Sequence, residues 1–149
     1  MIERRLLSAE VVSAIADTTA LPVGLAHAPS GGGWTGAPNL DGSNFTPYCV
    51  VTPNTATLAS GSFDEPQGDR QLPYTISSFG VMPEQTEWMA DKARAAVESM
   101  KKTTVTLGDG NYRIQQVRTD VVGGLQRVDS TEPAYWGQVD VVTLWITRD

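Results

Sequence analysis

The stretch LPYTISSFGVMPEQTEWMADKARAAVESMKK, residues 72–102, decides the fold class, because a strand pattern passes directly into a helix pattern within it. Leu72, Tyr74 and Ile76 alternate with proline, threonine and serine, and this period of two is typical of a half-buried strand. After a short turn, Pro83 suits the first position of a helix. The stretch therefore predicts one strand and one helix that follow each other in the chain.

The helix predicted by this stretch carries an apolar stripe made largely of small residues. Glu84 and Glu87 lie in its first turns, and Lys101 and Lys102 follow at its far end, as the helix dipole favours. The stripe consists of Met89, Ala93, Ala96, Val97 and Met100. Because alanine lets a helix approach its neighbours closely, we expect this helix to lie flat on a sheet, with Trp88 anchoring one edge.

Upstream of this stretch, the chain alternates between one more helix pattern and short strand patterns. Residues 2–17 predict a helix, because leucine, valine and isoleucine recur four apart on one face. Residues 21–26 and 48–52 predict short strands. Residues 53–71 are polar and rich in turn formers, and we expect a loop there with a short extended piece at 57–58.

Downstream, two extended runs flank Gly108-Asp109-Gly110-Asn111, which is the strongest hairpin signal in the chain. A polar, glycine-rich connection over residues 123–137 then leads to a last strand at 139–146, apolar on nearly both faces like a central strand. The order of elements predicts an α+β fold with an antiparallel or mixed sheet, two helices packed on it, and long glycine-rich loops. We expect a single domain spanning residues 1–149.

The composition argues against several classes of protein. A formal net charge of −6 over 149 residues disfavours a protein that grips nucleic acid, since such proteins concentrate lysine and arginine. No apolar run approaches the roughly 20 residues that a membrane helix needs, and the N-terminus has no signal-peptide pattern. Cys49 is the single cysteine, which excludes an intrachain disulfide and favours a reducing compartment.

The glycine-rich stretch HAPSGGGWTGAPNLDGSN, residues 27–44, does not fit a phosphate-binding or catalytic loop. It holds five of the 14 glycines and the one histidine, but no lysine occurs before Lys92 and no helix pattern follows it. His27 has only Cys49, inside an apolar strand, as a thiol partner, and one histidine with one cysteine is too few ligands for zinc. We therefore expect no catalytic residue, no metal site and no cofactor.

Aromatic residues in the two long connections are candidates for contacts between subunits. Trp34 and Phe45 belong to the first glycine-rich arm, and the second connection carries Arg127, Tyr135 and Trp136. Aromatic and arginine side chains supply much of the contact energy at protein interfaces. Two interpretations stay open: the first arm orders against a neighbouring subunit, or its tryptophan folds back on its own domain.

Three stretches carry a resemblance to a known family: LPVGLAHAPSGGGWTG, then PYCVV, then LPYTISSFGVMPEQTEWMADKARAAV. In this progression the chain resembles the tail terminator proteins of bacteriophages with long, non-contractile tails that infect actinobacteria. The similarity runs from residue 21 to the final strand and is most specific over residues 74–94. None of these stretches is a catalytic motif.

The resemblance implies a structural protein of the virion that is assembled in the host cytoplasm. It implies a ring of subunits, usually a hexamer, that caps the tail tube, stops tube polymerisation and joins the tail to the head-completion proteins. DNA would pass through the lumen without specific binding, and an acidic lining would repel its phosphates. Asp64, Glu65 and Asp69 are the candidates for that lining.

Other functions stay open from the sequence. Within the same class, the chain could be another head–tail connector or a tail-tube subunit, and a tube subunit would polymerise into long filaments. A different class is a small-molecule-binding domain or enzyme that uses the 27–44 loop as a lid, with His27 as its one histidine.

Overall fold

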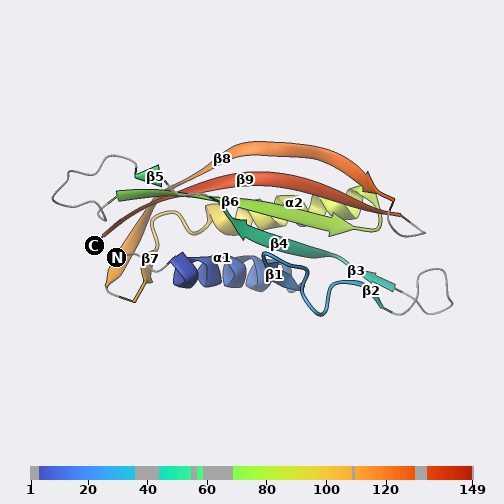
Figure 1. Cartoon of the computed structure of the whole chain (residues 1–149), viewed down its shortest axis with the longest axis horizontal. Helices are drawn as coiled ribbons and strands as arrows, with labels where there is room; N and C mark the ends of the chain where they lie inside the picture. The colour runs from blue at the N-terminus through green and yellow to red at the C-terminus, as the bar shows by residue number, and fades with distance from the viewer. Residues whose placement is uncertain are drawn as a thin grey trace.

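The computed structural model describes residues 4–35, 44–54, 57–58, 69–108, 110–129 and 134–148. In chain order these residues form α1 (Arg4–Thr19), β1 (Val23–Leu25), β2 (Gly33–Thr35), β3 (Asn44–Thr46), β4 (Tyr48–Pro53), β5 (Thr57–Leu58), β6 (Asp69–Gly80), α2 (Pro83–Glu98), β7 (Thr104–Thr106), β8 (Asn111–Val128) and β9 (Tyr135–Arg148) (Figure 1). The predicted α+β class is confirmed, and the two predicted helices and the short piece at 57–58 are present.

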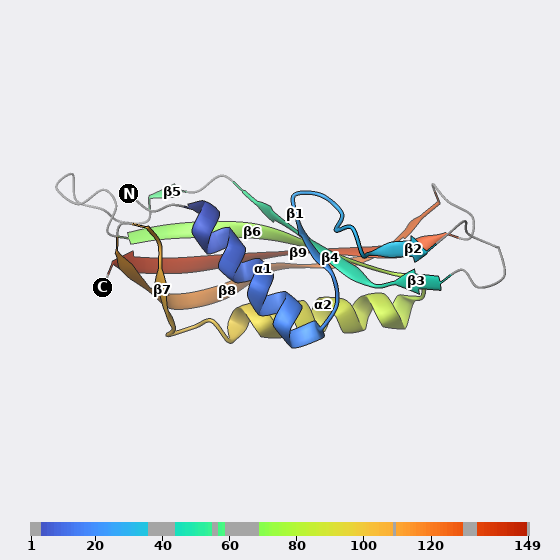
Figure 2. The same ribbon diagram turned by 90° about the horizontal axis from the view of Figure 1, so that it is seen from below.

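One mixed sheet dominates the molecule. Its strands follow the order β1-β4-β6-β9-β8-β7, with β5 paired on β6, while β2 and β3 form a separate two-stranded sheet. β1 pairs with β4 in parallel, and every other described pairing is antiparallel. The expected hairpin around Gly108 is confirmed as the β7–β8 pair, in which Thr106 lies opposite Asn111. Long β6, β9 and β8 lie side by side along the whole molecule (Figures 1 and 2).

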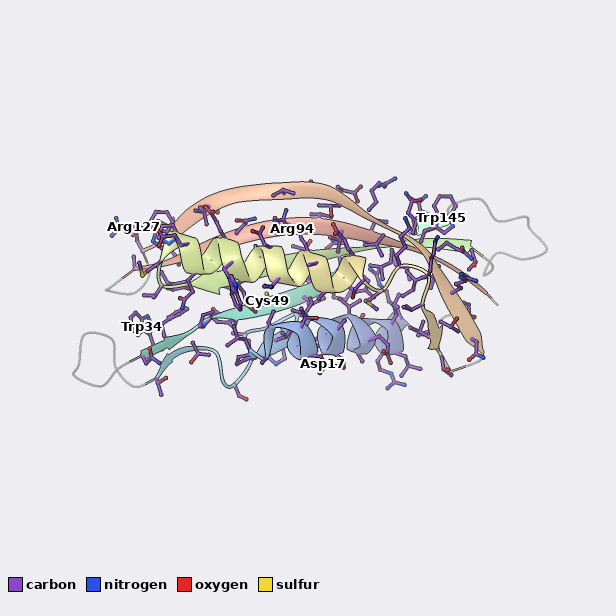
Figure 3. All side chains as sticks on the ribbon, turned by 180° about the vertical axis from the view of Figure 1, so that it is seen from behind. Asp17, Trp34, Cys49, Arg94, Arg127 and Trp145 are labelled. Carbon is purple, nitrogen blue, oxygen red and sulfur yellow. The ribbon has the colours of Figure 1, made fainter. Side chains whose placement is uncertain are left out.

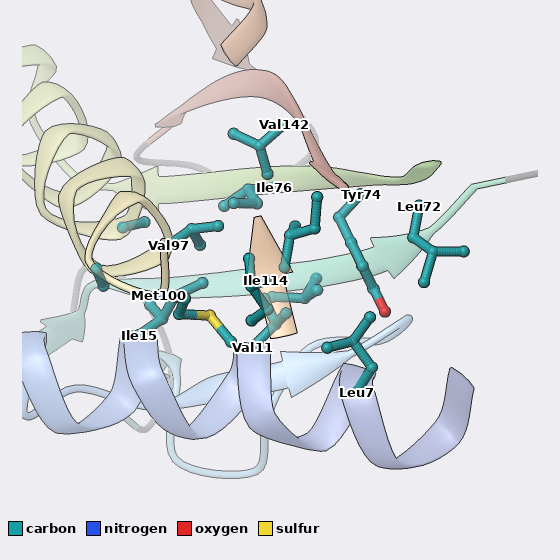
Figure 4. Packing of buried hydrophobic residues seen from close by; sticks show 14 of the residues in the cluster. Leu7, Val11, Ile15, Leu72, Tyr74, Ile76, Val97, Met100, Ile114 and Val142 are labelled. Carbon is teal, nitrogen blue, oxygen red and sulfur yellow. The ribbon is translucent and has the colours of Figure 1, made fainter. Parts of the chain in front are cut away.

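Both helices lie on the same side of the sheet, and the core fills the space between them and the strands (Figures 2 and 4). The predicted apolar stripes of the two helices are buried: Leu7, Val11, Ile15, Met89, Ala93, Ala96, Val97 and Met100. α2 packs on β6, β8 and β9, whereas α1 packs on α2, β1 and β4. The hydroxyls of Ser8 and Tyr74 share a buried hydrogen bond of 3.0 Å that ties α1 to β6.

Two expectations about α2 differ from the structure. Trp88 was expected to anchor one edge of the helix, but it is 44% exposed and does not belong to the buried core. The helix ends at Glu98 rather than near Lys102, and the backbone N–H of Ser99 bonds to Ala95. The predicted residues of the apolar stripe are buried. A tryptophan next to this stripe packs on the sheet only if it lies on the same face of the helix.

The largest correction concerns residues 123–137, which form strand over most of their length instead of a loop. β8 continues to Val128 and β9 begins at Tyr135, so the two strands pair from Tyr112 opposite Arg148 to Val128 opposite Tyr135. Three bulges, between residues 114 and 116, 119 and 121, and 122 and 125, each add one residue to β8. The glycines that suggested a turn therefore lie in a bulge, which bends a strand without ending it.

Candidate assembly surface

Five aromatic rings gather at one end of the sheet. Trp34 meets Phe45 edge to face with ring centroids 5.4 Å apart, and Phe45 stacks on Tyr135 at 5.7 Å. Tyr48 stacks on Phe79 at 4.8 Å, and Phe79 meets Tyr135 at 6.0 Å. The two arms that the sequence singled out thus meet within one chain, since the first supplies Trp34 and Phe45 and the second supplies Tyr135.

The two predicted anchors of the first arm differ in how much surface they keep. Phe45 is 6% exposed, so its ring is already used by its own chain. Trp34 is partly exposed, and its buried indole Nε1–H has no acceptor among the described residues. Both residues lie on the short β2–β3 pair, directly opposite each other. Figure 3 shows Trp34 at this end of the molecule. Of the two, Trp34 retains the surface that a neighbouring subunit could contact, and its interface role stays a prediction.

The glycines beside Trp34 leave room for the aromatic cluster to pack. A Cβ atom on Gly32 would lie 2.7 Å from the Tyr48 ring, so a side chain there has no room. Gly33 has a φ of +86°, a backbone conformation that favours glycine. The pKa of Tyr48 is raised, first by burial and then by Tyr135. Close packing and backbone conformation therefore account for glycine at these two positions.

The candidates of the second arm lie in the β8–β9 ladder. Arg127 pairs directly with Trp136, and Val128 with Tyr135. Because successive residues of a strand point to opposite faces, Tyr135 and Trp136 lie on different faces of the sheet. The Arg127 side chain is exposed and forms an ion pair with Asp129 at 3.0 Å. These residues therefore lie at one end of the β8–β9 ladder instead of in a loop.

The predicted lumen residues are placed only in part. Asp64 and Glu65 lie outside the described residues. Asp69 begins β6, where its backbone pairs with Thr147, and its side chain is outside the described part. Their predicted role in lining a lumen stays a prediction.

His27 and Cys49 occupy very different surroundings. His27 is exposed, and its ring Nδ1 donates to the Leu25 carbonyl oxygen at 2.6 Å. Cys49 is fully buried, with its Sγ 3.3 Å from the Ser78 Oγ. Burial raises the pKa of the Cys49 thiol to about 12, so the thiol stays protonated at neutral pH. Cys49 thus acts as a small apolar side chain in the sheet.

A buried carboxylate, which sequence reasoning missed, links the sheet to α2. Asp140 is fully buried on β9, where its Oδ1 accepts from the Gly123 backbone N–H at 3.0 Å and from Gln138 Nε2 at 3.1 Å. Arg94 of α2 places its Nε 3.6 Å from Asp140 Oδ2, beyond hydrogen-bond distance, and also pairs with Asp91. An aspartate within the apolar run of residues 139–142 was the signal that could have revealed it, because buried carboxylates require partners.

The sheet face opposite the helices has a small hollow of limited volume. It is lined by Gln71, Gln116, Arg118, Thr143 and Trp145, with a cavity volume of about 10 Å³. Ligand pockets usually enclose about 300–1,000 Å³, so this hollow is too small for a typical ligand.

The Thr143 hydroxyl donates to Asp120 and lowers the pKa of the Asp120 carboxyl below the ordinary 3.8. Arg118 lowers it further, against the opposing effect of partial burial.

The same face and the adjoining edge of β8 expose apolar side chains and unpaired backbone. Val121, Val122 and Val139 are 49%, 56% and 45% exposed. β7 pairs with β8 only over Asn111–Arg113, and Ile114 still bonds to residues 102 and 103. Within the described part of the chain, residues 115–128 have no strand on their outer side (Figures 1 and 2). We call residues 115–128 the open edge.

Two kinds of feature are not found among the described residues: a metal-binding cluster and a membrane-spanning helix. Among them, no three histidine, cysteine, aspartate or glutamate side chains lie close enough together to hold a metal ion. No helix formed by them has the length and apolar character needed to cross a bilayer.

Comparison with known proteins gives a distant structural likeness. No protein-family model and no curated protein matches the chain. One solved structure, whose name states no function, aligns with 98% of this chain and 92% of its own, at 12% identity and a TM-score of 0.49. A likeness of this degree carries no argument about fold or function.

Proposed function

We propose that this protein is the tail terminator of a long-tailed bacteriophage of the kind that infects actinobacteria. In this role its subunits form a ring, of six copies in the family it resembles. The ring caps the tail tube, stops tube polymerisation and joins the tail to the head-completion proteins. It belongs to the virion at the head–tail junction and is assembled in the host cytoplasm. The resemblance is most specific over residues 74–94, which lie in the later part of β6, the turn and most of α2.

One structural observation supports assembly as the role of this fold: the helices cover one face of the sheet, while the open edge and its valines are left exposed. Unpaired strand edges carry free N–H and C=O groups that a neighbouring chain can satisfy. When a partner covers the exposed β-branched side chains beside such an edge, the buried apolar surface stabilises the complex by about 25 cal/mol per Å². A protein partner satisfies both needs at once.

The net charge of −6 fits passage of DNA through a ring. A carboxylate-rich lumen repels phosphates over about one Debye length, roughly 8 Å at physiological salt. DNA therefore slides through without a specific contact, in contrast to the basic surfaces of DNA-binding proteins. Asp64, Glu65 and Asp69 remain our candidates for this lining.

The proposal is tested with purified protein and tail tubes of the matching phage. Electron microscopy should show rings at tube ends, and adding the protein during tube assembly should shorten the tubes in a dose-dependent manner. Light scattering on the protein alone should give either monomers or one closed ring. Long filaments would indicate a tube subunit, and attachment to heads but not to tubes would indicate a different connector; either result would refute the proposal.

The alternative function, in which the 27–44 loop is the lid of an enzyme or ligand-binding site, predicts that His27 is needed for activity or ligand binding. His27→Ala removes the exposed imidazole and its bond to the Leu25 carbonyl without touching the core. A terminator with this substitution should still cap tubes as the unmodified protein does. Loss of an enzymatic activity or of ligand binding in this variant, with capping absent in both proteins, would favour the lid.

A further inference from the structure

We propose that three hydrogen bonds, one at each bulge of β8, fix this strand in a single register on β9. The bonds thereby determine which side chains β8 presents on each face of the sheet. This inference concerns how the chain holds its own 18-residue strand, so it does not depend on the proposed function.

Each bulge of β8 is crossed by a hydrogen bond to a side chain of β9, and we call these three hydrogen bonds the bridges. β8 and β9 curve together along the molecule, so the bridges are spread over the length of the pair (Figure 1). From donor to acceptor, the bridges run from Gln115 Nε2 to Thr147 Oγ1 at 2.9 Å, from the Thr143 hydroxyl to the Asp120 carboxylate, and from the Gly123 N–H to Asp140 Oδ1 at 3.0 Å.

The three bridges share a geometry. In each bridge, the residue of β9 is paired in the ladder with a residue of β8 that precedes the bridged one. These ladder pairs are Arg113 with Thr147, Arg118 with Thr143, and Val122 with Asp140. Each bridge therefore reaches back along β8 and ties a residue of the bulge to the ladder pair before it.

The bulges need such bonds because the ladder alone fixes them weakly. The inserted residue of a bulge has no partner in the ladder. Within the part of the chain that the structure describes, residues 115–128 also have no strand on their outer side to hold them. When a bulge moves along a strand, the residues that it passes change their partners and faces, since side chains alternate with a period of two.

The second bulge shows how a bridge selects one register. Val121 now pairs with Val141. If the bulge moved one residue onward, Asp120 would pair with Val141, and Thr143 would become its diagonal neighbour. Diagonal neighbours lie roughly 7–8 Å apart, which is too far for two short side chains to share a hydrogen bond. The bridge therefore forms only when Asp120 is the inserted residue.

The second and third bridges are the stronger ones. Both use a carboxylate, and hydrogen bonds to a charged acceptor are about twice as strong as neutral ones. Water competes little with them, because Asp140 is fully buried and Thr143 is 7% exposed. The first bridge is neutral, and Gln115 is exposed. We therefore expect the second and third bridges to contribute most to holding the register.

Removing the bridges one at a time from the full-length protein tests the proposal. Thr147→Val and Thr143→Val each remove one hydroxyl and keep nearly the same shape in a strand-forming residue. Asp140→Asn weakens the third bridge, because a neutral amide oxygen replaces the carboxylate. The measurement is amide hydrogen exchange by NMR at constant pH.

The expected result is local to each bulge. Amides of β8 beside the altered bridge should exchange about threefold faster in Thr147→Val and about tenfold faster in Thr143→Val and Asp140→Asn. Residues around that bulge should also show a second set of resonances, which reports the second register. Amides of α1 and β4 should exchange as in the parent, because neither element contacts a bridge.

Thr119→Val is the matched control on the same strand. The Thr119 hydroxyl bonds to Glu98 of α2 at 3.4 Å, so this substitution removes a bond of β8 that crosses no bulge. Exchange in Thr119→Val should stay within about twofold of the parent, and its resonances should remain single.

Two results would overturn the proposal. One is a Thr143→Val protein with single resonances and exchange within twofold of the parent. The other is a Thr119→Val protein in which the same amides loosen as much as in Thr143→Val. If Asp140→Asn fails to fold, the comparison of Thr143→Val with Thr119→Val decides the matter, because neither of those substitutions disturbs the buried carboxylate.

Discussion

Two adjacent glycines in the β8 bulge give a direct test of how the sheet is built. A Cβ atom on Gly123 would lie 2.1 Å from the Val139 carbonyl oxygen, whereas a Cβ on Gly124 has no atom within 4 Å. Neither glycine has a positive φ, so alanine suits both backbones apart from the contact. Gly123→Ala should therefore destabilise the protein strongly, and Gly124→Ala is its matched control.

The expected magnitude follows from what Gly123→Ala must displace. The clashing atom is backbone, fixed by the β8–β9 ladder, so relief requires β8 to move away from β9. That movement lengthens the 3.0 Å bond from the Gly123 N–H to the buried Asp140 carboxylate. A hydrogen bond to a charged group contributes about 1.5–3 kcal/mol, and residual strain from overpacking adds about 1–3 kcal/mol. We expect a loss of about 3 kcal/mol in unfolding free energy.

The assay is urea unfolding followed by tryptophan fluorescence, with thermal unfolding as a second measure. For a domain of this size, a loss of about 3 kcal/mol lowers the melting temperature by roughly 6–12 °C. Gly124→Ala should leave the stability unchanged or raise it by up to about 1 kcal/mol, because alanine restricts the unfolded chain. Stabilities of the two variants within about 0.5 kcal/mol of each other would refute the close contact at Gly123.

Three further predictions concern single side chains. Arg94→Met should cost about 3 kcal/mol in denaturant unfolding, because it leaves buried Asp140 without its cation, and Arg94→Met with Asp140→Asn should recover part of this loss. Asp120→Asn should lower stability above pH 3.8, and the difference from the parent should vanish as the pH falls through the lowered pKa of Asp120, measured by acid titration of unfolding. Trp34→Ala should weaken ring assembly in light scattering and leave the monomer folded; an unfolded variant would show that Trp34 belongs to the core.

The elements that follow from local spacing were predictable. The alternation at Leu72, Tyr74 and Ile76 places all three side chains in the core of β6, where they are at most 2% exposed. The helix over Pro83–Glu98 begins at the predicted proline. Such patterns depend on contacts between residues two to four apart, and the sequence displays those spacings directly.

The connection at 123–137 was not predictable in the same way. Two adjacent glycines ordinarily indicate a turn, and only the register of β8 on β9 shows that Gly123 and Gly124 lie in a bulge. The bulge also depends on Asp140, which lies 17 residues away and accepts the Gly123 N–H. A pairing over that separation leaves no local pattern in the sequence.

The candidate assembly surface was also predictable only in part. Trp34, Phe45 and Tyr135 were recognised from the sequence as aromatic residues in glycine-rich arms, but their meeting in one cluster depends on β3 and β9 reaching the same end of the sheet. The exposure of Val121 and Val122 could not be foreseen, because an apolar pair within a strand ordinarily predicts burial.

The sequence by itself determined the α+β class, the two helices with their buried stripes, the β7–β8 hairpin, and the burial of Cys49 in an apolar strand. The tertiary structure decided which strands became neighbours, which face the helices covered, and which edge was left open. The physical reason is that periodicity and turn chemistry act within a few residues. Which sheet face the helices cover and which strands pair depend instead on contacts between segments far apart in the chain, and no short stretch of sequence records those contacts.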